Sequence, residues 1–251
     1  HSIPGLLGFS ALVSLGLLAI FPATPFWSLF FWTFMGTLSH GVFDLLNSYG
    51  AKLLWPLVKK RITVNFVMVT DPLILSAFMI AFLFRQQHYV EFAAFFISAI
   101  YLCWRWSAKQ KVAKLLKQDL GKDAEQILVL PAMYKPFSWD FVIETKDRFI
   151  TGTAPFGKNT LVVREILKKE VHPCIDVAEE SALGDVFREF TPCYHVTRTW
   201  QENQQVIEFA DLRYYVKDSF MHTGTAVLDQ EGELVEAIFQ PYSKKKVIKI
   251  A

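Results

Sequence analysis

Cysteine is scarce in this chain, with three residues among 251. Cys103 lies in an apolar segment, whereas Cys174 and Cys193 follow in the second half without a Cys-x-x-Cys pair. Three cysteines cannot all pair within one chain, and disulfide-stapled secreted domains use many more. The neighbouring His172 and His195 do not give the spacing of a zinc finger or ribbon. We therefore expect buried, reduced cysteines in this part of the chain.

A large charge of one sign is also missing, because the formal net charge is only +2. Domains that bind nucleic acid carry a strong basic excess and often place aromatic residues among the basic ones. The lysines between Lys109 and Lys117 have no interleaved aromatic residue. We expect no nucleic-acid partner, and we expect these lysines to lie near anionic lipid head groups.

The N-terminus lacks the charged segment and the cleavage site of a signal peptide. Residues 6–21 are apolar but follow His1 without a basic region. We therefore expect a further N-terminal segment to precede His1 in the native protein.

Apolar residues are abundant, at 52% of the chain with 23 phenylalanines, and most of the excess lies before residue 107. This distribution predicts an α-helical membrane domain followed by a mainly antiparallel β (α+β) soluble domain. We expect about four transmembrane helices. The predicted parts are a helical membrane domain (1–106), a basic juxtamembrane helix (107–121) and a β-rich domain (122–251), and the predicted membrane helices are 5–21, 26–46, 73–84 and 89–106.

Lysine and arginine are concentrated in two places, the loop from Lys52 to Arg61 and the segment after residue 105. Cytoplasmic loops of membrane proteins carry this excess. We therefore expect a multi-pass protein with a cytoplasmic C-terminal domain. Thr70 or Asp71 is expected to cap the third helix, and Gly50 to cap the end of the second.

Short alternating segments separated by polar turns predict an antiparallel sheet with one buried face after residue 126. One helix, at 178–190, is expected to cover it, and 244–250 is expected to be an edge strand protected by lysines. The predicted inner strands are 127–130, 139–144, 148–153, 195–200, 206–216, 225–228 and 234–239.

The second apolar helix carries one polar stripe. Its members recur at helical spacing and are Thr33, Thr37, His40, Asp44 and Asn47. His40 and Asp44 are one turn apart, so both side chains leave the same face. An ionisable group at membrane depth costs roughly 2.5–3.5 kcal/mol, so such a stripe must face protein or a water-filled cavity. The pair has two interpretations: the two side chains form hydrogen bonds to each other or to a neighbouring helix, or they are two ligands of one metal ion.

The predicted topology brings further polar residues to the same membrane face. It places His1, His40, Asp44 and Asp71 near one another. Neutral imidazole and carboxylate groups suit a divalent metal ion, with zinc as the first expectation and manganese as the alternative. The convergence of these four residues therefore favours a metal site over a hydrogen bond alone, and a catalytic site would keep one position open for water.

These residues resemble the motifs of a family of membrane-bound, predicted metal-dependent hydrolases that includes bacterial YdjM and YfhP-type proteins. Residues 1–4 (His-Ser-Ile-Pro) are similar to the end of the family's His-Arg-Gly-x-Thr-His-Ser motif, and residues 66–72 resemble a later segment that ends in Asp-Pro. The second motif is matched by Ser39, His40, Asp44, Asn47 and Gly50. The likeness covers residues 1 to about 106 and implies the bacterial inner membrane.

The wider relatives of that family are similar to zinc-dependent phospholipases C and P1-type nucleases, whose metal sites use a His-x-x-x-Asp pair. By this resemblance His1, His40 and Asp44 hold the metal. In that scheme, Asp71 or Asn47 orients a ligand or the attacking water. The upstream half of the first motif does not occur in this sequence.

Two functions follow as hypotheses. The first is an integral membrane metal-dependent hydrolase that acts on a phosphoester or another lipid-linked substrate at the cytoplasmic face by metal-activated water. The second is a non-catalytic membrane anchor whose β-rich domain recruits a protein partner. A transporter is disfavoured, because the sequence has no pair of broken helices. The expected partners are membrane lipids in both cases.

Overall fold

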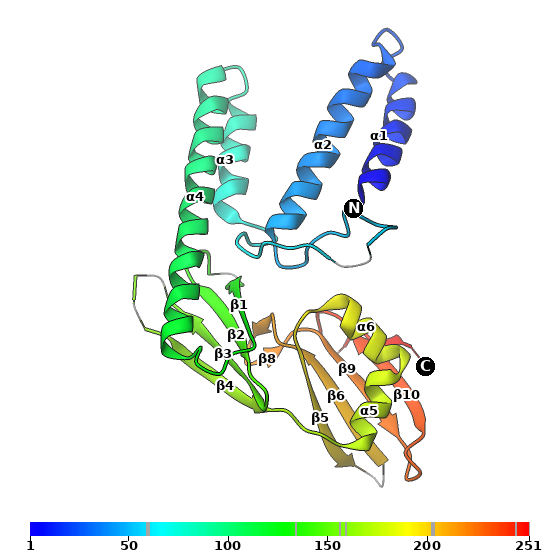
Figure 1. Cartoon of the computed structure of the whole chain (residues 1–251). Coiled ribbons are helices and arrows are strands. Elements are labelled where there is room, and N and C mark those ends of the chain that lie inside the picture. Colours follow the sequence, from blue (N-terminus) through cyan, green and yellow to red (C-terminus); the bar gives the residue numbers. More distant parts are fainter. Residues whose placement is uncertain are drawn as a thin grey trace. The chain divides into compact units, whose positions relative to one another are not determined.

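The computed structural model describes residues 1–58, 61–133, 135–155, 157–158, 160–201, 204–243 and 245–250. The chain divides into two compact units, His1–Trp106 and Ser107–Ala251. Helices build the first unit, and antiparallel strands with two short helices build most of the second (Figure 1). Lys59, Lys60, Glu202, Asn203 and Lys244, which belong to the predicted basic loop, hairpin turn and edge strand, lie outside the described residues.

Four helices form the helical part: α1 (Ile3–Leu18), α2 (Phe26–Leu46), α3 (Pro72–Leu83) and α4 (His88–Asp119). Ser2 caps α1 by accepting a hydrogen bond from the backbone N–H of Gly5 at 3.2 Å. The bounds of α2 confirm the prediction. Its predicted glycine cap is wrong, because the C-cap is Asn47. Gly50 instead lies in the next turn with φ +69°, where a Cβ would approach the Ile62 carbonyl oxygen to 2.5 Å.

Asp71 caps α3, as one of the two predicted alternatives. Its Oδ1 accepts hydrogen bonds from the backbone N–H groups of Leu73 at 3.1 Å and Ile74 at 3.4 Å. Pro72 occupies the first turn, where its missing N–H costs nothing.

The prediction of a separate basic helix after residue 106 is wrong, since α4 continues to Asp119. Residues 107–119 contain no glycine or proline, and most of them are good helix formers. The change from apolar to basic residues therefore alters the surroundings of this helix without ending it.

The expectation of about four membrane spans needs correction. Among the described residues, only α2 is both long and apolar enough to cross a membrane, by length and composition alone. α1 and α3 are apolar but have 16 and 12 residues, which correspond to roughly 24 and 18 Å at 1.5 Å per residue. α4 is long, but Glu91 and Arg105 interrupt its apolar part.

The second unit contains two larger antiparallel sheets rather than the single predicted one. The first has the order β1-β2-β3-β4, the second β11-β10-β9-β6-β5, and β7 pairs with β8. The strands are β1 (Gln126–Pro131), β2 (Trp139–Glu144), β3 (Arg148–Ala154), β4 (Val162–Lys168), β5 (Tyr194–Gln201), β6 (Gln204–Asp211), β7 (Tyr215–Val216), β8 (Ser219–Phe220), β9 (Thr223–Leu228), β10 (Leu234–Gln240) and β11 (Ile248–Lys249).

Several strand predictions are confirmed and others are not. β2 has the predicted bounds, and β11 lies at a sheet edge beside β10 as expected. The predicted strand 206–216 is interrupted after Asp211, and β4 was not predicted. Val163, Ile166 and Leu167 in β4 recur at helical spacing, so their pattern does not identify a strand.

The helix predicted at 178–190 is two helices, α5 (Pro173–Glu180) and α6 (Ala182–Phe190). Ser181 separates them with an extended backbone and caps α6 through Leu183. Phe187 of α6 and Phe209 of β6 are fully buried in the core between these helices and the five-stranded sheet.

Candidate metal centre

The ends of α1 and α2 bring three potential metal ligands together. His1 directly precedes the Ser2 cap of α1, and His40 and Asp44 lie in the last two turns of α2. One ligand atom from each residue lies within 4.8 Å of the other two. The helical hairpin thus joins His1 to Asp44, which is 43 residues away in sequence.

Asp44 is central to this cluster. Its Oδ2 is in short contact with His1 Nδ1 and lies 3.6 Å from His40 Nε2. The two imidazole rings meet edge to face, with centroids 5.1 Å apart. The exposed fractions of the side chains are 57% for His1, 65% for His40 and 20% for Asp44. The carboxylate is therefore sheltered, while both imidazoles remain accessible to a ligand.

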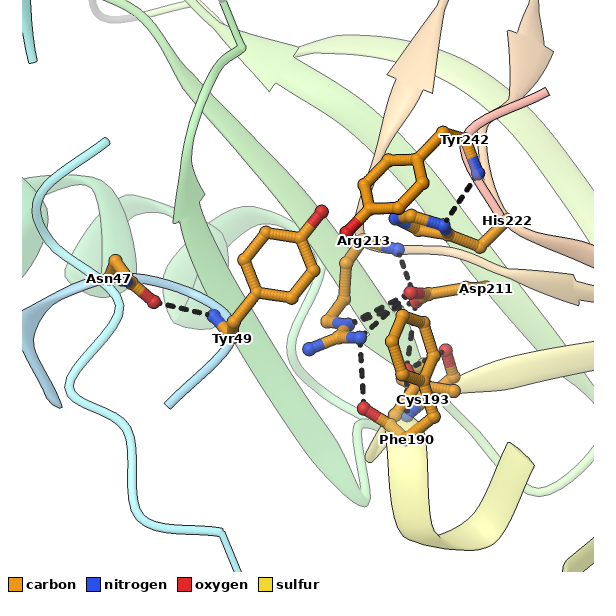
Figure 2. A network of polar contacts seen from close by, with 9 residues as sticks. Asn47, Tyr49, Phe190, Cys193, Asp211, Arg213, His222 and Tyr242 are labelled. Atoms are coloured by element: carbon orange, nitrogen blue, oxygen red, sulfur yellow. Dashed lines mark hydrogen bonds and ion pairs between the residues drawn. The ribbon is translucent and has the colours of Figure 1, made fainter. Parts of the chain in front are cut away.

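Asn47 holds the carboxylate from the other side. Its Nδ2 donates to Asp44 Oδ1 at 3.3 Å. Its Oδ1 accepts from the backbone N–H groups of Tyr49 at 2.8 Å, as Figure 2 shows, and Gly50 at 3.2 Å. Thr63 Oγ1 also donates to the Asn47 backbone carbonyl. The amide orientation is thus fixed by the turn that follows α2, and Asn47 acts on Asp44 as a positioning residue.

The donor set fits a divalent metal ion. Two imidazole nitrogens and one carboxylate oxygen are the protein ligands of many catalytic zinc sites, which leave a fourth position for water or substrate. Manganese also accepts this combination. The polar stripe predicted on α2 would therefore supply two of three potential ligands, His40 and Asp44, and the residue His1 would supply the third.

Asp71 has other partners. Besides capping α3, its Oδ2 accepts a hydrogen bond from the Tyr101 hydroxyl at 2.9 Å. Arg105 is fully buried, interacts electrostatically with Asp71 and donates from Nε to the Phe66 carbonyl at 2.9 Å. The predicted convergence of Asp71 with the histidines is thus not among its described contacts. Asp71 instead joins α3 to α4. The sequence did not indicate this contact, because Tyr101 and Arg105 are 30 or more residues away from Asp71.

The N-terminal part of the polar stripe contributes to the packing of α2 against α1. Thr37 Oγ1 and Thr33 Oγ1 each lie 2.8 Å from a serine hydroxyl of α1, Ser10 and Ser14 respectively. Both serines also donate to backbone carbonyls one turn earlier. The expectation that the stripe faces protein is confirmed for these residues. Small hydroxyl residues allow close helix approach and satisfy one another in an apolar surrounding.

In the second unit the histidines and cysteines have structural contacts. His172 caps α5 by accepting from the Cys174 N–H at 3.2 Å. Cys174 and Cys193 are free and buried, and burial raises the pKa of the Cys193 thiol. His195 packs against the Phe149 ring, and burial lowers its pKa. Within the described ranges, the cluster of His1, His40 and Asp44 is the one group of three such side chains close enough to share a metal ion.

A buried ion pair, absent from the sequence predictions, organises the end of β6. Arg213 Nη2 lies 2.8 Å from Asp211 Oδ2 and 3.0 Å from the Phe190 carbonyl oxygen (Figure 2). His222 nearby is fully buried and accepts from the Tyr242 backbone N–H at 3.2 Å. Burial lowers the pKa of His222 to about 4. These residues tie strand ends together and are far too enclosed to meet a substrate.

The two units are similar to different described families. Residues 1–112 match the family model described as "YdjM inner membrane protein". Residues 173–250 match the "YfhP C-terminal alpha/beta plait domain". A curated relative is "Uncharacterized protein YfhP" of Bacillus subtilis (strain 168), with 24% identity over 227 residues that cover 88% of this chain and 68% of the relative. No solved structure matches the chain. These descriptions name a membrane protein family and state no activity.

Proposed function

Since this chain is a YdjM/YfhP-like protein of a membrane protein family, we propose that it is a metal-dependent hydrolase embedded in the bacterial inner membrane. Its substrate is a phosphoester or another lipid-linked group at the cytoplasmic face. The observation that carries this proposal is the meeting of His1, His40 and Asp44 within 4.8 Å.

Each residue of the site has a distinct part. His1 and His40 would hold the metal ion through ring nitrogens, and Asp44 would hold it through a carboxylate oxygen. Asn47 keeps the carboxylate in place by its hydrogen bond to the other oxygen. The metal ion, preferably zinc and otherwise manganese, would lower the pKa of a bound water toward 7 and polarise the phosphoryl oxygen. The exposure of both imidazoles leaves the substrate a path to the site.

Asn47 is the positioning residue of the site, whereas Asp71 has a structural role. The Asp71 carboxylate is occupied by the α3 cap and the Tyr101 hydroxyl. It supports the fold of the region between α2 and α3 rather than touching substrate.

We propose a multi-pass arrangement with a cytoplasmic C-terminal domain, in which α2 crosses the membrane and the apolar surfaces of α1, α3 and α4 lie within the bilayer. Large apolar side chains on them point away from protein, with exposed fractions of 70% for Leu12 and 74% for Trp27. Comparable residues on α3 and α4 are Phe82, Leu83, Phe92, Phe95 and Ile100. An apolar helix that is shorter than the hydrocarbon region is accommodated by local thinning of the bilayer. The lysines of the last part of α4 favour the cytoplasmic side.

Metal content tests the site directly. Full-length protein purified in detergent should contain about one zinc or manganese ion per chain by elemental analysis. His40→Ala and Asp44→Ala should each lose most of it, because three ligands become two. His88→Ala is the matched control, since His88 is an exposed histidine on α4 that contacts only Glu91 among its described partners. Wild-type protein without a divalent metal would refute the proposal.

The non-catalytic anchor remains a second candidate, and one observation favours it. Strand β4 lies at the edge of its sheet, and it exposes the apolar side chains of Val162, Val163 and Ile166. Exposed apolar edge strands can pair with another chain. If the anchor is correct, Ile166→Lys should abolish the cellular function, while His40→Ala should leave it intact.

A further inference from the structure

A cavity of about 460 Å³ lies between α1 and α2, and the proposed function does not account for it. Its volume falls within the roughly 300–1,000 Å³ of small-molecule sites. We call it the α1–α2 cavity. The residues that line it are His1, Gly5, Leu6, Phe9, Gly36, Thr37 and His40. It therefore begins at two of the three candidate metal ligands.

The cavity is polar at one end and apolar beyond it. His1 precedes α1, while Phe9 lies two turns further along, about 12 Å away at 1.5 Å per residue. On α2, Gly36 lies one turn beyond His40. The Thr37 hydroxyl is already engaged with Ser10 and the Phe34 carbonyl. Beyond the histidines the lining thus offers mainly apolar surface.

Glycine leaves this space open on the α2 side. A Cβ placed at Gly36 would meet no heavy atom within 4 Å. The absence of a side chain is therefore not required by close helix packing at this position. It does leave room for a narrow, flexible group beside Phe9.

The surroundings favour an aliphatic occupant over a water-soluble one. Phe9 and Leu12 on α1 and Trp32 on α2 are all more than half exposed. Such apolar surface suits contact with lipid hydrocarbon. A phospholipid has an aliphatic chain that can contact this apolar lining, whereas a small soluble phosphoester has none.

We propose that the α1–α2 cavity binds one acyl chain of a membrane phospholipid and thereby presents its phosphate ester to the cluster of His1, His40 and Asp44. This inference rests on the proposed function, because it assigns the apolar part of the substrate of the same site. The lipid stays within the leaflet while its head group reaches the imidazoles. The cavity thus selects lipid phosphoesters over soluble ones.

Photolabelling tests this occupant without depending on catalysis. Full-length protein would be reconstituted in phosphatidylglycerol vesicles that contain a phosphatidylglycerol with a diazirine in one acyl chain. After irradiation, adducts would be located by mass spectrometry. We expect them to concentrate on the peptides that carry Phe9 and Gly36, above the level on the other lipid-facing residues.

Two leucine variants make the test specific. Gly36→Leu places a side chain in the cavity and should reduce labelling at Phe9 to the level of the other lipid-facing residues, because the added side chain fills space that the acyl chain would occupy. Gly8→Leu is the control, because Gly8 lies on α1 with open space around it but does not line the cavity. Equal labelling at Phe9 in both variants, or uniform labelling along the helices, would overturn the inference.

Metal content of the same samples separates this inference from the function on which it rests. Normal metal content with uniform labelling would overturn the acyl-chain cavity and leave the metal site standing. Concentrated labelling that Gly36→Leu removes, in protein without metal, would support the cavity and refute the hydrolase.

Discussion

The two units place their apolar and polar side chains in opposite ways. In the first unit, Ser10 and Ser14 are fully buried while Trp27 and Trp32 are largely exposed. In the second unit, Phe187 and Phe209 are fully buried in the core between two helices and the five-stranded sheet. The hydroxyls of the first unit bond to threonines of the facing helix. This difference indicates that the first unit is stabilised in an apolar surrounding, whereas the second has a core that excludes water.

The largest expected effect contrasts two phenylalanines. Phe187→Ala should lower the free energy of unfolding of the second unit by about 4 kcal/mol, because its ring contacts Tyr194, Phe209 and Phe239 in the core. Phe95→Ala, at an exposed position of α4, should change stability by less than about 1 kcal/mol. Urea-dependent proteolysis of the full-length protein measures both. Equal losses would remove the contrast between the units.

The buried ion pair of the second unit should give the next largest effect. Asp211→Asn leaves Arg213 charged and enclosed, so we expect a loss of about 3 kcal/mol. The exposed pair of Asp185 and Arg188 on α6 supplies the control. Asp185→Asn should cost under about 1 kcal/mol. The same proteolysis assay measures both variants. If Asp211→Asn lowers the free energy of unfolding no more than Asp185→Asn does, the buried ion pair contributes no more to stability than the exposed one.

Because His222 is buried, we expect the stability of the second unit to depend on pH. Its pKa is about 4 when folded, against 6.5 for the ordinary group. The unfolded chain therefore binds the proton more readily, so stability is fully present above pH 6.5 and falls as the pH drops toward 4. At pH 4.5 the loss attributable to His222 should be about 2 kcal/mol. His222→Gln, which can still accept from the Tyr242 N–H, should show a shallower decline, and an unchanged slope would contradict this assignment.

The hydroxyl contacts between α1 and α2 should give the smallest effect. Ser10→Ala combined with Thr37→Val should show a coupling energy of about 0.6 kcal/mol in a double-mutant cycle. Thermal unfolding in detergent measures each variant. Full additivity of the two single changes would mean that this pair does not hold the helices together.

The sequence predicted most features that local chemistry determines. The bounds of α2, the Asp71 cap and the turn between Glu144 and Arg148 all follow from hydrophobic patterning, capping and turn residues. The continuity of α4 was missed, because a change in composition was taken for a boundary. Ser181 was missed as a break, since a serine is compatible with both a helix interior and a cap.

Residues that meet through tertiary structure were harder to predict. The encounter of His1 with Asp44 was expected, because the motif spacing and the topology placed both helix ends together. The partners of Asp71 were not, because no pattern indicates that Tyr101 of α4 faces the start of α3. The cavity beside Gly36 was also missed, since an isolated glycine in an apolar helix gives no signal of open space.

The most direct test of the account is the metal content of the full-length protein purified in detergent. The account predicts about one divalent ion per chain in wild-type protein and in His88→Ala, and its loss in both His40→Ala and Asp44→Ala. Wild-type protein that contains no divalent ion, or a metal content unchanged by both ligand substitutions, would contradict it.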